Sequence, residues 1–193
     1  VIAMQNQKAN RKEIFDIGIA GPLAGLVLAI PITGLGVAQL DSLGSSAGGT
    51  AFDMPLLIRW MHAWIHPDQN PLPSQLIASQ LNPMLMAGWV GLLITGLNML
   101  PVSQLDGGHV TYTLFGKHSR TIARVFIGIA IVYMVWNNVL VWTVMLVLIF
   151  AMGIYHPPTS DDEIPLGIFR VTLGCISLLI PVLCFPPRGL GFL

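Results

Sequence analysis

The feature that most constrains this chain is a long stretch without charge, from Ile17 to Leu40. A helix rises 1.5 Å per residue, so about 20 apolar residues cross the roughly 30 Å hydrocarbon core of a membrane. Charged residues make up only 9% of the chain, and its mean hydropathy is +0.73. These values predict an integral membrane protein. The formal net charge is zero, which argues against nucleic-acid binding, since that requires a concentrated basic surface.

Four further apolar runs are candidate membrane spans. Asn137 and Asn138 separate two of them and indicate the turn of a hairpin. The sequence therefore predicts an all-α integral membrane fold with about five transmembrane helices. The four additional runs are Met84 to Leu100, Ile122 to Trp136, Val139 to Tyr155, and Leu166 to Phe185.

The connection between the first two spans, residues 41–82, is unusually long. Its segment "MPLLIRWMHAWIHP" alternates apolar and polar residues at helical spacing, which predicts a re-entrant or interfacial amphipathic helix. His62 and His66 have the i, i+4 spacing of a zinc-binding pair, but Ala63 stands where such proteases carry their catalytic Glu. We favour an interfacial helix over a metal site. "GSSAG" at 44–48 fits a serine nucleophile pattern, but its loop context favours a chance match.

Basic residues set the expected orientation. Lys and Arg favour the cytoplasmic side of a membrane. They flank the first span on its N-terminal side and follow the second span, so we expect both flanks to be cytoplasmic and residues 41–82 to lie on the other side. The residues concerned are Lys8, Arg11, Lys12, Lys117, Arg120 and Arg124.

A lone carboxylate, Asp106, follows the second span within "GLNMLPVSQLDGGHV". At membrane depth a carboxylate costs at least a few kcal/mol and usually marks a functional site. Alternatively, Asp106 lies beyond the membrane edge and caps the next helix, with Gly107 and Gly108 forming a turn. Physical chemistry alone leaves both alternatives open. "GPLAG", Gly21 to Gly25, has small residues at the spacing that lets membrane helices pack closely.

Two longer motifs resemble one known family. "NMLPVSQLDGGH", Asn98 to His109, is similar to the N-x-x-P-x-x-x-L-D-G signature of the site-2 protease family of intramembrane zinc metalloproteases. "NRKEIFDIGIAGPLAG", Asn10 to Gly25, resembles the start of the helix that follows the zinc-binding helix in that family. The resemblance implies that residues 1–117 are the second half of the membrane core. Residues 118–193 would then add a transmembrane hairpin and a C-terminal helix.

The resemblance also implies roles for single residues. Asp106 matches the family's third zinc ligand, and Asn98 matches the asparagine that engages the substrate backbone. Pro101 matches the break that turns the chain into the substrate site. The residues after the ligand match a close-packed turn and a supporting histidine that is not itself a ligand: Gly107, Gly108 and His109.

The activity implied by the resemblance is zinc-dependent cleavage of transmembrane protein substrates within the lipid bilayer. The implied location is the inner membrane of a bacterium or an equivalent organellar membrane. No H-E-x-x-H occurs in the sequence, so Zn²⁺ could bind only with histidines from elsewhere. We therefore expect this chain to be the C-terminal part of a longer protease. Two alternatives remain: a non-catalytic pseudoprotease that binds membrane helices, and an ion-coupled transporter with Asp106 as the relay.

Overall fold

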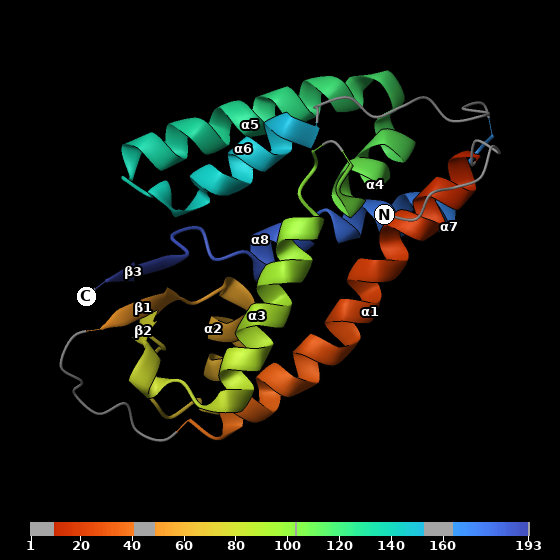
Figure 1. Ribbon diagram of the computed structural model, residues 1–193. Coiled ribbons are helices and arrows are strands. Elements are labelled where there is room, and N and C mark those ends of the chain that lie inside the picture. The colour runs from red at the N-terminus through yellow and green to blue at the C-terminus, as the bar shows by residue number, and fades with distance from the viewer. Residues whose placement is uncertain (1–9, 41–48, 103, 153–163, 193) are drawn as a thin grey trace. The chain divides into compact units, whose positions relative to one another are not determined.

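The computed structural model describes residues 10–40, 49–102, 104–152 and 164–192, and it is mostly helical (Figure 1). The "GSSAG" segment lies outside the described residues. The α-helices are α1 Arg11–Ala38, α2 Leu56–Ile65, α3 Pro83–Asn98, α4 Asp106–Phe115, α5 Ser119–Trp136, α6 Thr143–Met152, α7 Ile168–Ser177 and α8 Ile180–Cys184. The 3₁₀ helices are η1 Ala78–Gln80, η2 Gly116–His118 and η3 Leu140–Trp142, and the strands are β1 Thr50–Asp53, β2 Gln75–Ile77 and β3 Leu190–Phe192.

Two helical segments are long and apolar enough to cross a membrane, Arg11–Ala38 and Asp106–Trp136. The other predicted spans correspond to shorter apolar helices at Pro83–Asn98, Leu140–Ala151 and Ile168–Cys184. The prediction of a mostly helical chain is confirmed, and two of its helices are candidate membrane spans. The count of five spans stays a prediction.

Helix α1 begins before the apolar run because its first turn is capped. The Asn10 side-chain oxygen accepts hydrogen bonds from the backbone N–H groups of Lys12 and Glu13, each at 3.0 Å. In return, the Glu13 carboxylate accepts one from the Asn10 N–H at 2.9 Å. This reciprocal cap satisfies N–H groups that a helix start otherwise leaves unpaired. The charged residues from Arg11 to Asp16 are therefore helical.

The chain forms two compact units, each described here by itself. Unit 1 comprises residues 1–22, 98–138 and 143–179, and unit 2 comprises residues 23–97, 139–142 and 180–193. The predicted division at residue 117 does not coincide with these units and stays a prediction.

Unit 1 contains the start of α1, packed with α4 and α7. Its hydrophobic cluster consists of the buried side chains Phe15, Ile19, Val110 and Leu166. An ion pair also joins α7 to α1, because the Arg170 guanidinium donates to both carboxylate oxygens of Asp16, at 2.8 and 2.9 Å.

Unit 2 contains a small antiparallel sheet of order β2-β1-β3. Ala51 pairs with Ile77 on one side and with Gly191 on the other. The prediction of an all-α chain missed this sheet. Its strands are only three or four residues long, too short to show a clear alternation of apolar and polar residues.

A buried aspartate connects this sheet to its surroundings. The Asp53 backbone N–H donates to the Gly189 carbonyl at 2.9 Å, and one Asp53 carboxylate oxygen accepts from the Arg188 N–H at 2.8 Å. The Asp53 carbonyl accepts from the Trp89 indole N–H at 2.7 Å. Asp53 therefore ties β1 to both the C-terminal segment and α3.

Helix α2 confirms the predicted amphipathic helix in the long connection. Its buried face carries Ile58 and His62. The His66 Nε2–H donates to the Val37 carbonyl at 3.0 Å, since a carbonyl can only accept. Burial, followed by the nearby His66, lowers the pKa of His62. Both histidines thus have packing roles in unit 2.

In the same unit, the second half of α1 packs closely on α3 at glycines. A Cβ at Gly36 would collide with the Leu85 backbone, and a Cβ at Gly88 would collide with Thr33. At Gly91 the added atom would meet Ala29 alone, with the methyl at 3.1 Å and the Cα at 3.9 Å. Small residues at such contacts let membrane helices approach to backbone distance.

We predict that Gly36→Ala and Gly88→Ala each destabilise the protein by about 1–3 kcal/mol, the usual cost of overpacking. Gly91→Ala is the matched control on the same interface and should cost less, because its new neighbour is a methyl group. Unfolding free energies in mixed micelles measure the three values. Equal values would contradict this account of the packing.

We also predict that stability falls as pH rises above about 4, the ordinary pKa of an aspartate. Burial raises the pKa of Asp53, although the Arg188 N–H and the charges of Arg188 and Arg59 oppose the shift. The unfolded chain therefore ionises first, and the folded state loses relative stability up to its own raised pKa. Between pH 4 and 7, the melting temperature of Asp53→Asn should depend less steeply on pH than that of the parent protein. Asp68→Asn, at an exposed carboxylate of the same unit, should keep the parent slope.

Candidate active site

The candidate residues lie at the end of α3, in the segment that joins α3 to α4, and in the first turn of α4; Figure 1 labels the two helices. Asn98 is the last residue of α3 and Asp106 the first of α4. Between them, Met99, Leu100 and Val102 are buried. The Val102 N–H donates to the Leu100 carbonyl at 2.8 Å, and the Leu105 N–H donates to the Val102 carbonyl at 3.2 Å. These two backbone hydrogen bonds keep the segment around Pro101 compact.

Gly107 holds the two ends of this segment together. A Cβ at Gly107 would collide with the backbone of Met99 and with the Leu100 carbonyl oxygen. The residue after Asn98 and the residue after Asp106 are therefore in backbone contact. Only glycine permits this approach, which explains the residue type in physical terms. Gly108 is also buried.

The Asp106 side chain is half-buried. Leu105 occupies the N-cap position of α4, so the expectation that Asp106 caps this helix has no support in the geometry. Among the described residues, the carboxylate has no hydrogen bond or ion pair. A Cβ at Gly21 would lie 3.3 Å from one carboxylate oxygen. Gly21 thus leaves room at the carboxylate that any larger residue would reduce.

Helices α1 and α4 run antiparallel at this point. The Arg11 guanidinium donates to the Thr113 carbonyl at 2.8 Å. A Cβ at Gly18 would lie 2.9 Å from the His109 Cβ and 3.3 Å from the Asp106 carbonyl oxygen. Further along α1, Gly21 faces the Asp106 carboxylate. Advancing along α1 therefore means moving back along α4.

The antiparallel contacts between α1 and α4 locate Asp106 along the apolar run of α1. The uncharged run of α1 begins at Ile17, and Gly21 follows it by about 6 Å at 1.5 Å per residue. The carboxylate beside Gly21 therefore lies inside the apolar part of this helix. That position favours the buried functional acid over an acid beyond the membrane edge.

Gly18 and Gly21 are contributors that the sequence analysis did not assign to this site. "GPLAG" was interpreted as helix packing, and Gly25 does face a neighbouring helix, since a Cβ there would meet the Thr95 side chain of α3. Gly21 instead faces Asp106. The spacing Gly18, Gly21, Gly25 places all three near one helix face, but it does not say which neighbour each would meet.

The roles of Asn98, Pro101 and His109 stay predictions. Asn98 is exposed at the end of α3, Pro101 is half-buried, and His109 lies on α4 with its Cβ beside Gly18. The structure brings Asn98 and Asp106 to the two ends of one tight turn.

Within the described ranges, no cluster of three or more His, Cys, Asp or Glu side chains could hold a metal. Catalytic zinc normally has three protein ligands. Asp106 fits one of them, because it is a half-buried carboxylate without a protein partner among these residues. The described residues by themselves do not supply a complete zinc site.

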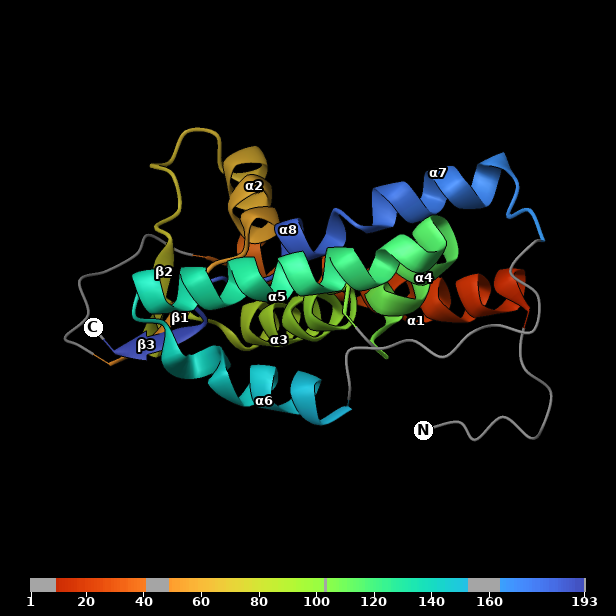
Figure 2. The same ribbon diagram turned by 90° about the horizontal axis from the view of Figure 1, so that it is seen from above.

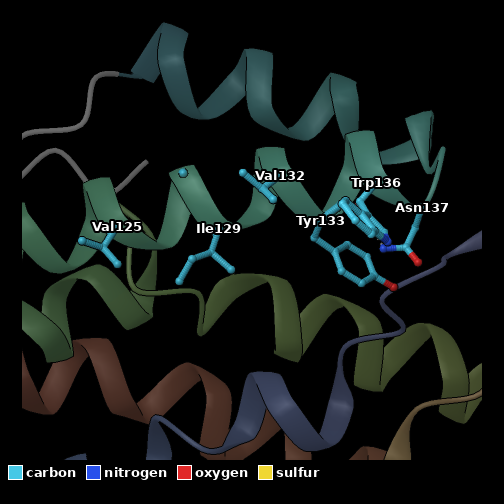
Figure 3. Close-up of a pocket in the computed structure, with 7 residues that line it drawn as sticks. Val125, Ile129, Val132, Tyr133, Trp136 and Asn137 are labelled. Atoms are coloured by element: carbon cyan, nitrogen blue, oxygen red, sulfur yellow. The ribbon is translucent and has the colours of Figure 1, made fainter.

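An open apolar groove runs along α5, away from Asp106 in sequence and lined from a single helix (Figure 3). Its only polar side chains are Tyr133 and Asn137. A surface of this kind on a spanning segment is typical of contact with lipid. The lining residues are Val125, Gly128, Ile129, Val132, Tyr133, Trp136 and Asn137.

The fold and site thus define a helical protein with candidate membrane-spanning helices and a half-buried acid at the start of one of them. A family model, Peptidase family M50, matches residues 1–136 of the 193. The chain belongs to this family of metallopeptidases, which confirms the resemblance to the site-2 proteases.

Several curated plant proteins are similar to the chain. "Probable zinc metalloprotease EGY2, chloroplastic" of Oryza sativa subsp. indica is 28% identical over 181 residues, covering 92% of this chain and 32% of that protein. The Arabidopsis thaliana EGY2 protein is 26% identical, over 100% of this chain and 34% of its own length. "Probable zinc metalloprotease EGY1, chloroplastic" of Oryza sativa subsp. japonica is 32% identical over 56% of the chain. The chain thus spans about one third of the EGY2 relatives. No solved structure matches significantly.

Proposed function

We propose that this chain is part of an intramembrane zinc metalloprotease that cleaves transmembrane protein substrates. Asp106 supplies one zinc ligand, and the H-E-x-x-H histidines and glutamate come from residues outside this chain. The observation that carries the proposal is the position of the Asp106 carboxylate, beside Gly21 and inside the apolar part of α1. Membership of peptidase family M50 and relatives named zinc metalloproteases support it.

The chain's own residues contribute position rather than proton transfer. Bound zinc would supply the Lewis acidity that peptide hydrolysis requires. The Asp106 carboxylate would bind the metal from the start of α4, where the Gly107 contact fixes the backbone. Gly18 and Gly21 keep α1 close to α4 without filling the space at the carboxylate. Burial of this kind restricts the carboxylate to few orientations, and such pre-organisation is what a metal site needs.

In this proposal Asn98 binds the substrate backbone. It is exposed at the end of α3, and the tight turn through Pro101 fixes it relative to Asp106. An amide side chain offers both a donor and an acceptor, which suits an unwound peptide segment whose own backbone groups lack helical partners. A membrane helix must unwind in this way before its amide bonds can be hydrolysed.

The proposed location is an organellar membrane or the inner membrane of a bacterium. The plant relatives are named chloroplastic, and the two candidate spans support a location in a bilayer.

We predict that Asp106→Asn in the full-length protein removes its zinc and its proteolysis. An amide is a much weaker zinc ligand than a carboxylate, and even residues one step removed from a metal change affinity about 10- to 100-fold. Zinc content by elemental analysis and cleavage of a tagged single-span protein, reconstituted in the same vesicles, measure the two effects.

Asp16→Asn is the matched control for that experiment, because Asp16 is an exposed acid on α1 that pairs with Arg170. It should keep the parent zinc content. If Asp106→Asn also kept full zinc, Asp106 would not be a ligand. A full-length parent without zinc would favour the pseudoprotease instead.

We predict a different outcome for Asn98→Ala. Zinc content should match the parent, whereas kcat/KM should fall about tenfold, the effect of losing one hydrogen bond worth about 1.4 kcal/mol. Unchanged turnover on the reconstituted substrate would contradict the substrate-binding role of Asn98, and loss of zinc would indicate a structural role.

A further inference from the structure

The outward face of α2 is aromatic. Trp60 and Trp64 lie one helical turn apart with 60% and 87% of their surfaces exposed, and Arg59 beside them is exposed as well. The opposite face packs Ile58 and His62 into unit 2. Figure 2 shows α2 as a short helix beside α8, Ile180–Cys184, of the same unit. Two exposed tryptophans on one short helix need an explanation, because such large side chains are normally covered.

The indole N–H groups of Trp60 and Trp64 differ from those of two other tryptophans. Trp89 donates to the Asp53 carbonyl at 2.7 Å, and Trp142 donates to the Pro187 carbonyl at 3.0 Å. For Trp60 and Trp64, the described part of the chain offers no acceptor. Their partner must therefore offer an apolar phase for the ring and an acceptor for the N–H.

The position of α2 on α1 indicates what that partner is. Val37, whose carbonyl accepts from His66, lies about 30 Å along α1 from the start of the apolar run at Ile17, at 1.5 Å per residue. A Cβ at Gly34 would come within 3.2 Å of the Met61 side chain, so α2 packs on this part of α1. Since the hydrocarbon core is about 30 Å thick, α2 is attached where α1 leaves it.

Most exposed apolar side chains on the two candidate spans are aliphatic, unlike the exposed tryptophans of α2. On α1 the most exposed apolar residues are the aliphatic Val27 and Leu28, and along α5 they include Ile129 and Val132, with the exposed Trp136 as the last residue of that helix. Aliphatic side chains are typical of the hydrocarbon region, and tryptophan is typical of the headgroup boundary. The change from aliphatic to aromatic therefore occurs where α1 ends.

We propose that α2 binds the phospholipid headgroup layer, with Trp60 and Trp64 inserted at its boundary with the acyl chains. The lipid ester carbonyls accept from the indole N–H groups, and the Arg59 guanidinium pairs with lipid phosphate. This contact fixes unit 2 in depth at the end of α1. The proposal is independent of any catalytic activity.

The test uses tryptophan fluorescence of the full-length protein in vesicles of brominated phosphatidylcholine. The fluorescence lost in Trp60→Phe/Trp64→Phe, relative to the parent, reports these two residues. We expect bromines near the headgroups to quench this fraction more strongly than bromines deep in the acyl chains. Trp89→Phe is the control, because Trp89 is buried and its fraction should resist lipid quenching.

Two results would overturn the proposal. Quenching of the Trp60 and Trp64 fraction by aqueous acrylamide, to the extent seen for free tryptophan, would place this face in water. Resistance to both acrylamide and brominated lipid would mean that protein covers it, either another part of the full-length chain or a partner. Variant folding is checked by circular dichroism, and a misfolded Trp60→Phe/Trp64→Phe protein would show that these residues are structural, against the proposal.

Discussion

The candidate site depends on one steric constraint, the contact of Gly107 with the backbone of Met99 and Leu100. Because this contact leaves no space for a side chain, the segment after α3 can approach the start of α4 this closely only with glycine at position 107. Asn98 and Asp106 are each next to the contact in sequence, so one packing event sets the position of both. A metal ligand and a substrate-binding group require this kind of fixed relation, and the same segment buries the apolar side chains of Met99, Leu100 and Val102.

Helix α1 and the segment from Asn98 to Asp106 could be predicted from the sequence, because the features that indicate them are local. The charge-free run from Ile17 predicted α1, and the spacing from Asn98 to Asp106 carried the family resemblance. The cap at Asn10 could also have been found, since Asn followed three residues later by Glu is a capping signal. The charge-free run alone does not indicate this helix start, because the charged residues at 11–16 precede that run.

The remaining features could not be predicted from local pattern. Strands β1, β2 and β3 pair residues as distant as Ala51 and Gly191, and no periodicity within three or four residues specifies such a pairing. The partners of Gly21 and Gly25 pose the same problem. The two residues lie near one face of α1, yet a rise of about 6 Å between them brings one to a carboxylate and the other to Thr95.

The depth of Asp106 also bears on the choice between a protease and a pseudoprotease. A carboxylate inside the apolar part of a span lowers its free energy either by binding a proton or by binding a cation. A pseudoprotease requires only the proton, which needs no defined geometry around the oxygens. This alternative leaves the space at Gly21 and the fixed backbone at Gly107 unexplained, since a protonated acid tolerates looser surroundings. A cation needs both, because its ligands must keep distance and direction. The geometry of the glycines, more than the acid alone, therefore favours a metal site.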